Sequence, residues 1–161
     1  RHRPAPRSLP RALPSALVTA YAYGDDALVE RFYDGTDVSV VCIETDEGVE
    51  ALTPVAVEYE KGHEFDFDAR YTAEFVSFSR PDLPEELIED LGRTAREAHK
   101  VLGLRHLSRS DFIVSADGSH VLLETAITPG TTETSVMPFA CTLSGTSLGQ
   151  VVLDLVRRTL P

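Results

Sequence analysis

The chain has 161 residues, a size that corresponds to one domain or to one lobe of a larger protein. Apolar residues make up 42% of it and charged residues 25%, which provides for a packed core and argues against global disorder. No run of 18 apolar residues exists, so the sequence predicts no membrane span. The basic N-terminal residues are not followed by the apolar stretch of a secretory signal, so none is expected.

The net charge of −11 is unevenly distributed along the chain. Residues 1–11 contain four arginines and no acid, so residues 12–161 carry 11 Lys+Arg against 26 Asp+Glu, a net charge of −15. Because so acidic a body repels nucleic acid and anionic membranes, neither is an expected partner.

Cysteine and histidine give little indication of a metal centre or a nucleophile. Cys42 and Cys141 lie in apolar runs, which is typical of reduced core residues in a cytoplasmic protein. No Ser-His-Asp or Cys-His order matches a hydrolase motif. The histidines are interpreted as surface or packing residues: His63, His99, His106 and His120.

The predicted elements begin with a linker or truncated start over residues 1–14, which are rich in proline and arginine. A short helix is expected over residues 15–21, with Ser15 as its cap. Three strands follow from valine-rich and alternating patterns, over residues 27–32, 37–44 and 51–60.

Two features interrupt this strand region. Pro54 indicates an edge position or a bulge within the third strand. Residues 63–75 have no clear period and are crowded with acids and aromatics, so we expect an ordered loop there.

The clearest predicted element is a helix from Leu83 to Leu102, where apolar residues recur at helical spacing. Asp82 and Glu85 fit a capping box at its start, and Gly103 fits a stop at its end.

A hairpin is predicted next, from segments 108–115 and 120–125 around a two-residue turn at Asp117-Gly118. A loop rich in Thr, Ser and Gly follows over residues 128–135.

The last helix is expected to start near Ser147, with Gln150 as its capping partner. Its buried face is predicted to consist of Leu148, Val151, Val152 and Leu155. The order of strands, helix, hairpin and helix predicts an α+β lobe over residues 15–161, an antiparallel sheet with helices packed on one side.

The predicted hairpin brings two acids together. With a two-residue turn, Asp111 lies opposite Glu124, and Arg109 shares their face. Two carboxylates placed directly across a strand pair repel each other by a few tenths to about 1 kcal/mol. Oxygen ligands on rigid strands suit Mg²⁺, which usually takes one or two carboxylates plus substrate phosphates. The alternative is an exposed hairpin face on which Arg109 offsets the two acids.

Residues 107–138, LSRSDFIVSADGSHVLLETAITPGTTETSVMP, are similar to the signature of the D-alanine–D-alanine ligases, a family of ATP-grasp carboxylate–amine ligases. The resemblance implies that Asp111 and Glu124 bind Mg²⁺, with Mn²⁺ as an alternative ion. It also implies that Arg109 and the backbone N–H of Gly130 stabilise the tetrahedral, oxyanion-like transition state. Ser135 would bind the carboxylate of the acceptor amino acid.

Residues 27–40, ALVERFYDGTDVSV, resemble the nucleotide hinge of the same family. The resemblance implies that Glu30, Arg31 and Tyr33 hold the adenine edge of ATP and that Asp37 holds the ribose hydroxyls.

Arg70 and Tyr71 resemble the Lys-Tyr pair of the loop that closes over the nucleotide. Arg70 would contact the phosphates, and Tyr71 would lie beside the substrate. The resemblance runs from about residue 12 to residue 160.

The match departs from the family pattern at several positions. Ala126 stands where the family has an Asn that supplies a second magnesium ligand, and a methyl group cannot coordinate a metal. Arg70 replaces a Lys, and Asp37 replaces a longer Glu. Residues 1–26 resemble neither the lysine-bearing strand, nor the phosphate loop, nor the domain that binds the first D-alanine. Lys61 and Lys100 do not fit the lysine's role.

Three functions remain open from the sequence. The first is the lobe of an ATP-dependent D-alanine–D-alanine ligase, which forms an acylphosphate and makes a peptidoglycan precursor for the cell wall, and which is inactive as this chain alone. The second is an ATP-grasp ligase with another amino acid or peptide as substrate. The third is a degenerate, non-catalytic fragment or a lobe that works with a separate chain. The expected partners are ATP, Mg²⁺, D-alanine and the missing N-terminal half, and a homodimer is also open.

Overall fold

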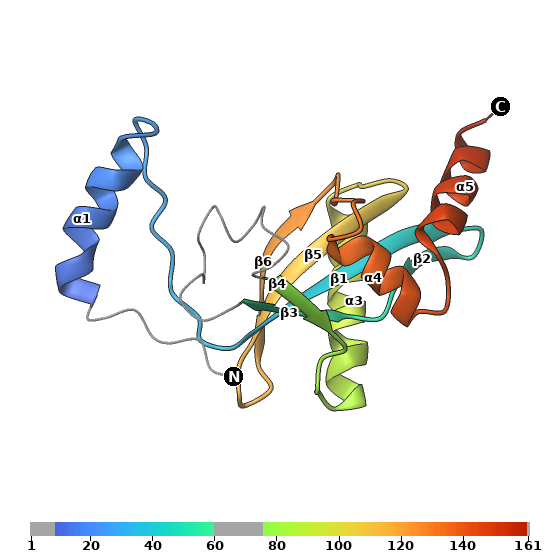
Figure 1. The fold of residues 1–161 in the computed structure, drawn as a ribbon, viewed down its shortest axis with the longest axis horizontal. Helices are drawn as coiled ribbons and strands as arrows, with labels where there is room; N and C mark the ends of the chain where they lie inside the picture. The colour runs from blue at the N-terminus through green and yellow to red at the C-terminus, as the bar shows by residue number, and fades with distance from the viewer. Residues whose placement is uncertain (1–8, 60–75, 161) are drawn as a thin grey trace.

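The computed structural model describes residues 9–59 and 76–160, and an antiparallel sheet forms its centre (Figure 1). Along this sheet the strands lie in the order β4-β3-β1-β5-β6, and β2 pairs with the C-terminal end of β1. The strands are β1 (Thr36–Thr45), β2 (Gly48–Ala51), β3 (Val55–Tyr59), β4 (Val76–Ser79), β5 (Leu107–Val114) and β6 (His120–Ala126).

Helices α3 (Glu85–Val101), α4 (Val136–Leu143) and α5 (Leu148–Thr159) cover the two faces of this sheet, and a further helix, α1 (Leu9–Tyr21), precedes it in the chain. Side chains alternate along β1, so Val40 packs in a core cluster with Leu91 of α3, whereas Val41 packs in a second cluster with Met137 of α4 and Val151 of α5. The predicted α+β class and antiparallel sheet are confirmed. The expectation that the helices pack on one side is wrong, because the central strands are apolar on both faces.

The N-terminal region differs from the prediction in two ways. The first helix begins at Leu9, six residues earlier than expected, and contains Pro14. The predicted strand over residues 27–32 is wrong, because this segment is coil with Leu28 and Val29 exposed. A strand needs a hydrogen-bonded neighbour, and no described strand pairs with this one. In Figure 1, α1 stands apart from the sheet and joins β1 through this extended segment.

The strands around Pro54 differ from the prediction in their boundaries, and one further strand, β4, was not predicted. The expected strand over residues 51–60 is confirmed only as β3, from Val55 to Tyr59. Its first residue, Ala51, ends the separate strand β2, and Pro54 lies in the break between the two, since proline has no N–H to donate to a ladder. The short β4 was not predicted; it pairs with β3 at the sheet edge, with Val57 opposite Phe78. The predicted loop over residues 63–75 lies outside the described residues.

The predicted central helix is confirmed as α3, but its capping box is wrong. The chain enters the helix through Pro84, which occupies the N-cap without a side-chain hydrogen bond, and Asp82 lies too early to cap it. The end is as predicted: Gly103 has φ +63°, and the N–H of Leu104 donates to the carbonyl of His99 at 3.0 Å, a Schellman closure.

Sequence patterns missed α4 and found α5. The α4 segment VMPFACTL is apolar except for Thr142, so its sequence shows no clear amphipathic period, and it is buried at Val136, Met137, Ala140 and Cys141. In α5, the hydroxyl of Ser147 accepts a hydrogen bond from the N–H of Gln150 at 3.1 Å, which confirms Ser147 as the cap. The Gln150 side chain donates to Asp154 instead of returning to Ser147, so the second half of the predicted capping box is wrong. Val152 was expected inside but is 44% exposed.

The cysteines and His99 are packing residues, as predicted. Cys42 lies in the core cluster beside α3 and Cys141 in the cluster beside α4, so the sheet separates the two thiols. His99 is buried, and its Nδ1 lies 2.8 Å from the hydroxyl of Ser108. Within residues 9–59 and 76–160 no single helix is long and apolar enough to cross a membrane; α4 and α5 reach that length only together, across a 99° bend.

Candidate functional site

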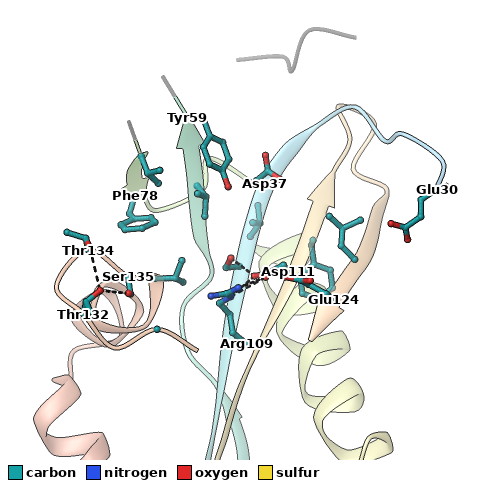
Figure 2. Close-up of a pocket in the computed structure, with 18 residues that line it drawn as sticks. Glu30, Asp37, Tyr59, Phe78, Arg109, Asp111, Glu124, Thr132, Thr134 and Ser135 are labelled. Carbon is teal, nitrogen blue, oxygen red and sulfur yellow. Dashed lines mark hydrogen bonds and ion pairs between the residues drawn. The ribbon is translucent and has the colours of Figure 1, made fainter. Parts of the chain in front are cut away.

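A cavity of about 780 Å³ lies over the sheet, with residues of β1, β3, β5 and β6 in its lining and the start of α4 at its side. That volume is within the range of sites for small ligands and cofactors. Figure 2 shows Arg109, Asp111 and Glu124 near its centre, with the loop from Thr132 to Ser135 on one side and Glu30 on the other. The cavity therefore collects residues from segments that are far apart in the sequence.

The hairpin of β5 and β6 places Asp111 opposite Glu124, as predicted, but through a different geometry. Close to the turn, Val114 pairs with His120, so the connection is longer than the predicted two-residue turn. A bulge at Leu123 then shifts the register by one residue and brings Glu124 opposite Asp111. Without this bulge, the turn-proximal register would place Leu123 opposite Asp111.

Asp111 accepts hydrogen bonds from two side chains of the site. Arg109 holds it in a bidentate ion pair, with Nε 2.8 Å from Oδ1 and Nη2 2.7 Å from Oδ2. The hydroxyl of Ser39 donates to Oδ1 at 2.7 Å from the neighbouring strand β1, where Ser39 is the cross-strand partner of Asp111. The side chains of Arg109 and Asp111 are 23% and 20% exposed, so the pair is mostly shielded from water.

The charges around Arg109 explain its electrostatics. Burial alone lowers the pKa of Arg109, but the hydrogen bond to Asp111 and the charges of Asp111 and Glu124 outweigh that effect, so the pKa is raised overall. The described lining of the cavity carries four carboxylates, from Glu30, Asp37, Asp111 and Glu124, against the single guanidinium of Arg109. The net negative charge of this lining therefore attracts cations and repels an anion that is not bound to a cation.

A second group of site residues lies where α4 begins. Ser135 is the N-cap of α4 but makes no side-chain cap hydrogen bond; its hydroxyl lies 2.8 Å from the hydroxyl of Thr132. Gly130 lies directly beside it, since a Cβ added there would be 2.7 Å from the hydroxyl oxygen of Ser135. The structure thus brings Gly130 and Ser135 together on the cavity wall. Their roles in stabilising the transition state and in binding the acceptor carboxylate stay predictions.

The predicted nucleotide residues divide into three groups. Glu30 and Asp37 line the cavity. Arg31 and Tyr33 do not line it; the guanidinium carbon of Arg31 lies 5.2 Å from the centre of the Tyr33 ring, a cation–π contact. Arg70 and Tyr71 lie outside the described residues.

Among the cavity residues that sequence reasoning missed are Ser39, Tyr59 and Phe78. A signal for Ser39 existed, because it is a polar residue in the apolar run VSVVC, two residues after Asp37 and therefore on the same strand face. Its partner Asp111 is 72 residues away, and only the pairing of β1 with β5 shows that contact.

The donor set fits a metal that is shared with a ligand rather than one held by protein alone. Among the described residues no group of three or more His, Cys, Asp or Glu could hold a metal ion. Two carboxylates, from Asp111 and Glu124, lie across from each other, and the side chain of Ala126 on the same strand has no oxygen to add. Mg²⁺ is commonly bound by one or two carboxylates together with substrate phosphates and water, so this pair is sufficient only when a phosphate ligand is present.

Comparison with known proteins identifies the family. Residues 9–157 match the family model described as the D-ala D-ala ligase C-terminus. The chain belongs to the D-alanine–D-alanine ligase family. It is 33% identical over 141 residues to a D-alanine–D-alanine ligase of Parabacteroides distasonis and 38% identical over 142 residues to one of Geobacter sulfurreducens. Each match covers 88% of this chain but 42% of the relative, so the chain spans about two fifths of their length.

Solved structures of D-alanine–D-alanine ligases share the fold. A Bacillus anthracis ligase complexed with ATP gives a TM-score of 0.73 at 18% identity, over 91% of this chain and 45% of that one. A D-alanyl-alanine synthetase A of Vibrio cholerae gives 0.76 at 23% identity, over 92% and 46%. The VanG D-Ala:D-Ser ligase of Enterococcus faecalis gives 0.75, also at 23%, over 91% and 43%.

Proposed function

We propose that this chain is the C-terminal lobe of an ATP-dependent D-alanine–D-alanine ligase, which requires residues beyond this chain for activity. The observation that supports this most directly is the convergence of Arg109, Asp111 and Glu124 beside Gly130 and Ser135 in one cavity. Those five residues are the ones that the resemblance to the family selects, and the chain belongs to that family.

In this proposal the four carboxylates of the cavity bind a metal–nucleotide complex. Asp111 and Glu124 would bind Mg²⁺, which neutralises phosphate charge and orients the transferred phosphoryl group when bound. Asp37 and Glu30, on the same cavity, would hold the ribose and the adenine edge. The excess of acids around Arg109 would otherwise repel ATP, so we expect nucleotide to bind here only together with the metal.

The reaction proposed has two steps. A carboxylate oxygen of the first D-alanine takes the terminal phosphoryl group of ATP, which gives an acylphosphate and ADP. The amine nitrogen of the second D-alanine then attacks the carbonyl carbon, a C–N bond forms, a proton leaves the nitrogen, and phosphate departs. Arg109 and the N–H of Gly130 would stabilise the oxyanion of the tetrahedral intermediate, because donors fixed in place before the reaction need no reorganisation.

The acceptor amino acid would bind at the start of α4. Ser135 presents its hydroxyl at a helix N-terminus, where unpaired backbone N–H groups and the helix dipole favour an anion such as a carboxylate. The hydroxyl of Thr132, 2.8 Å away, would hold the Ser135 hydroxyl in position. An acceptor other than D-alanine remains compatible with this loop.

The test of this function uses titration calorimetry and a phosphate-release assay on the 161-residue chain. We expect no D-alanine-dependent phosphate release, and ATP–Mg²⁺ binding no tighter than roughly millimolar, about −4 kcal/mol. The reason is that the described cavity lining has one cationic side chain, Arg109. The Ala126→Asn variant should bind little better, because one added ligand does not supply the missing phosphate contacts. Micromolar affinity or measurable ligase turnover in the unmodified chain would contradict the proposal.

A second candidate is a lobe that binds nucleotide without catalysing ligation. Two observations favour it: Ala126 lacks a coordinating oxygen, and Arg109 already occupies both carboxylate oxygens of Asp111. Joining the chain to the first half of a D-alanine–D-alanine ligase from one of the relatives distinguishes the two. Activity of the joined protein supports the ligase, and nucleotide binding without turnover supports the second candidate.

A further inference from the structure

The hydroxyl of Ser39 occupies an unusual position in this sheet. It lies in the middle of β1, in a strand whose neighbours are apolar, and its residue is 5% exposed. A buried hydroxyl requires a hydrogen-bond partner, and this one has a carboxylate oxygen of Asp111 at 2.7 Å. An alcohol that donates to a charged acceptor makes a stronger hydrogen bond than one between neutral groups.

From this contact we infer that Ser39 is a positioning residue for Asp111, which holds the carboxylate from β1 independently of Arg109. The inference rests on the proposed function, in which Asp111 serves a metal and Arg109 serves an oxyanion. Arg109 donates to Asp111 through Nε and Nη2, and the remaining N–H groups of its five are directed elsewhere on the guanidinium, where a substrate oxyanion could accept from them. Among the described residues, the Ser39 hydroxyl is the second side chain that donates to Asp111, so it continues to hold the carboxylate if the guanidinium shifts toward substrate.

The geometry of the contact assigns different tasks to the two carboxylate oxygens. Oδ1 accepts from the Ser39 hydroxyl and from Nε of Arg109, whereas the short contact of Oδ2 is with Nη2 of Arg109 alone. Any shift of Arg109 toward a substrate would therefore expose Oδ2 to a metal, while Ser39 keeps Oδ1 held from β1. Because β1 and β5 pair over eight residues, from Thr36↔Val114 to Ile43↔Leu107, the hydroxyl is carried on a rigid support.

The experiment uses Mn²⁺ with ADP as the probe and the ¹⁵N-labelled 161-residue chain as the protein. Mn²⁺ broadens amide resonances near its site even when only a small fraction is bound, so millimolar affinity is sufficient. We expect broadening at Asp111 and Glu124 in the unmodified chain. Ser39→Val should reduce it about tenfold at equal Mn²⁺–ADP, which corresponds to a loss of about 1.4 kcal/mol. Ser39→Thr, which has the same shape as valine and keeps the hydroxyl, should retain it.

Controls separate positioning from general loss of structure. Ser110→Ala removes an equally buried strand hydroxyl that bonds Thr125 rather than Asp111, and it should leave the broadening unchanged. Thermal unfolding of each variant checks that the fold is present. Equal broadening in Ser39→Val and Ser39→Thr would overturn the positioning role and leave the proposed function intact. If the unmodified chain shows no broadening at Asp111 while Mn²⁺–ADP is in millimolar excess, the proposed metal site itself is wrong.

Discussion

The ion pair of Arg109 and Asp111 predicts how the chain responds when its charge is removed. Asp111→Asn keeps the shape of the side chain but cancels the negative charge that faces the guanidinium. Arg109 would remain 77% shielded from water, beside the weaker acceptor of an amide. The buried guanidinium loses its bidentate partner, and the Ser39 hydroxyl loses a charged acceptor.

The magnitude follows from the burial of the pair. Breaking a fully buried ion pair costs about 3–5 kcal/mol, whereas an exposed pair is worth about 0–1 kcal/mol. Since both side chains are about one-fifth exposed and asparagine keeps one acceptor, we expect a loss of about 2 kcal/mol. In a chain of this length that corresponds to a decrease of roughly 4–8 °C in Tm.

Urea unfolding followed by circular dichroism measures this change. Glu124→Gln is the matched control, because Glu124 is exposed and its removal also relieves repulsion from Asp111, so its stability should change by no more than about 0.5 kcal/mol. A double-mutant cycle with Arg109→Met isolates the pair. If Asp111→Asn proves as stable as the unmodified chain, the ion pair contributes no net stability and the reasoning from burial is wrong.

Two further predictions concern backbone packing and a buried thiol. Gly35→Ala places a Cβ 2.3 Å from the carbonyl oxygen of Val114, so urea unfolding should show a loss of stability of about 2–3 kcal/mol. In the control Gly24→Ala the added Cβ meets nothing within 4 Å, so stability should change by under about 0.5 kcal/mol. Equal losses in the two variants would refute the steric argument. Burial raises the pKa of Cys42 to about 11 from an ordinary 9.0, against the opposing charge of Arg96. The unfolded thiol ionises first, so stability falls as pH rises from about 9 to about 11, by about 2 kcal/mol more than in Cys42→Val. Parallel alkaline unfolding curves for the two proteins would contradict this.

Local sequence patterns were sufficient where the controlling interactions are local. The apolar spacing from Leu83 to Leu102 predicted α3 because an amphipathic period determines which face is buried. Gly103 marked its end because glycine adopts positive φ without strain. Ser147 marked the start of α5 because its cap bond spans three residues. The motif from Arg109 to Ser135 was recognisable because its residues lie close together in the chain.

Elements that depend on distant neighbours were predicted poorly. Residues 27–32 have the composition of a strand but form none, because composition supplies no pairing partner. The α4 segment has no amphipathic period, because it is buried between the sheet and α5, and such a run cannot be distinguished from a strand by periodicity. The placement of helices on both sheet faces likewise depended on how β1 distributes its valines between two cores.

The site shows the same division between local and tertiary information. The sequence by itself placed Asp111 opposite Glu124, although it did so with a turn that is too short, and a bulge at Leu123 restores the pairing. It could not place Ser39 against Asp111, since that contact joins residues 72 positions apart. Only the pairing of β1 with β5 decides it, because the register between those strands is determined by the packing of both sheet faces.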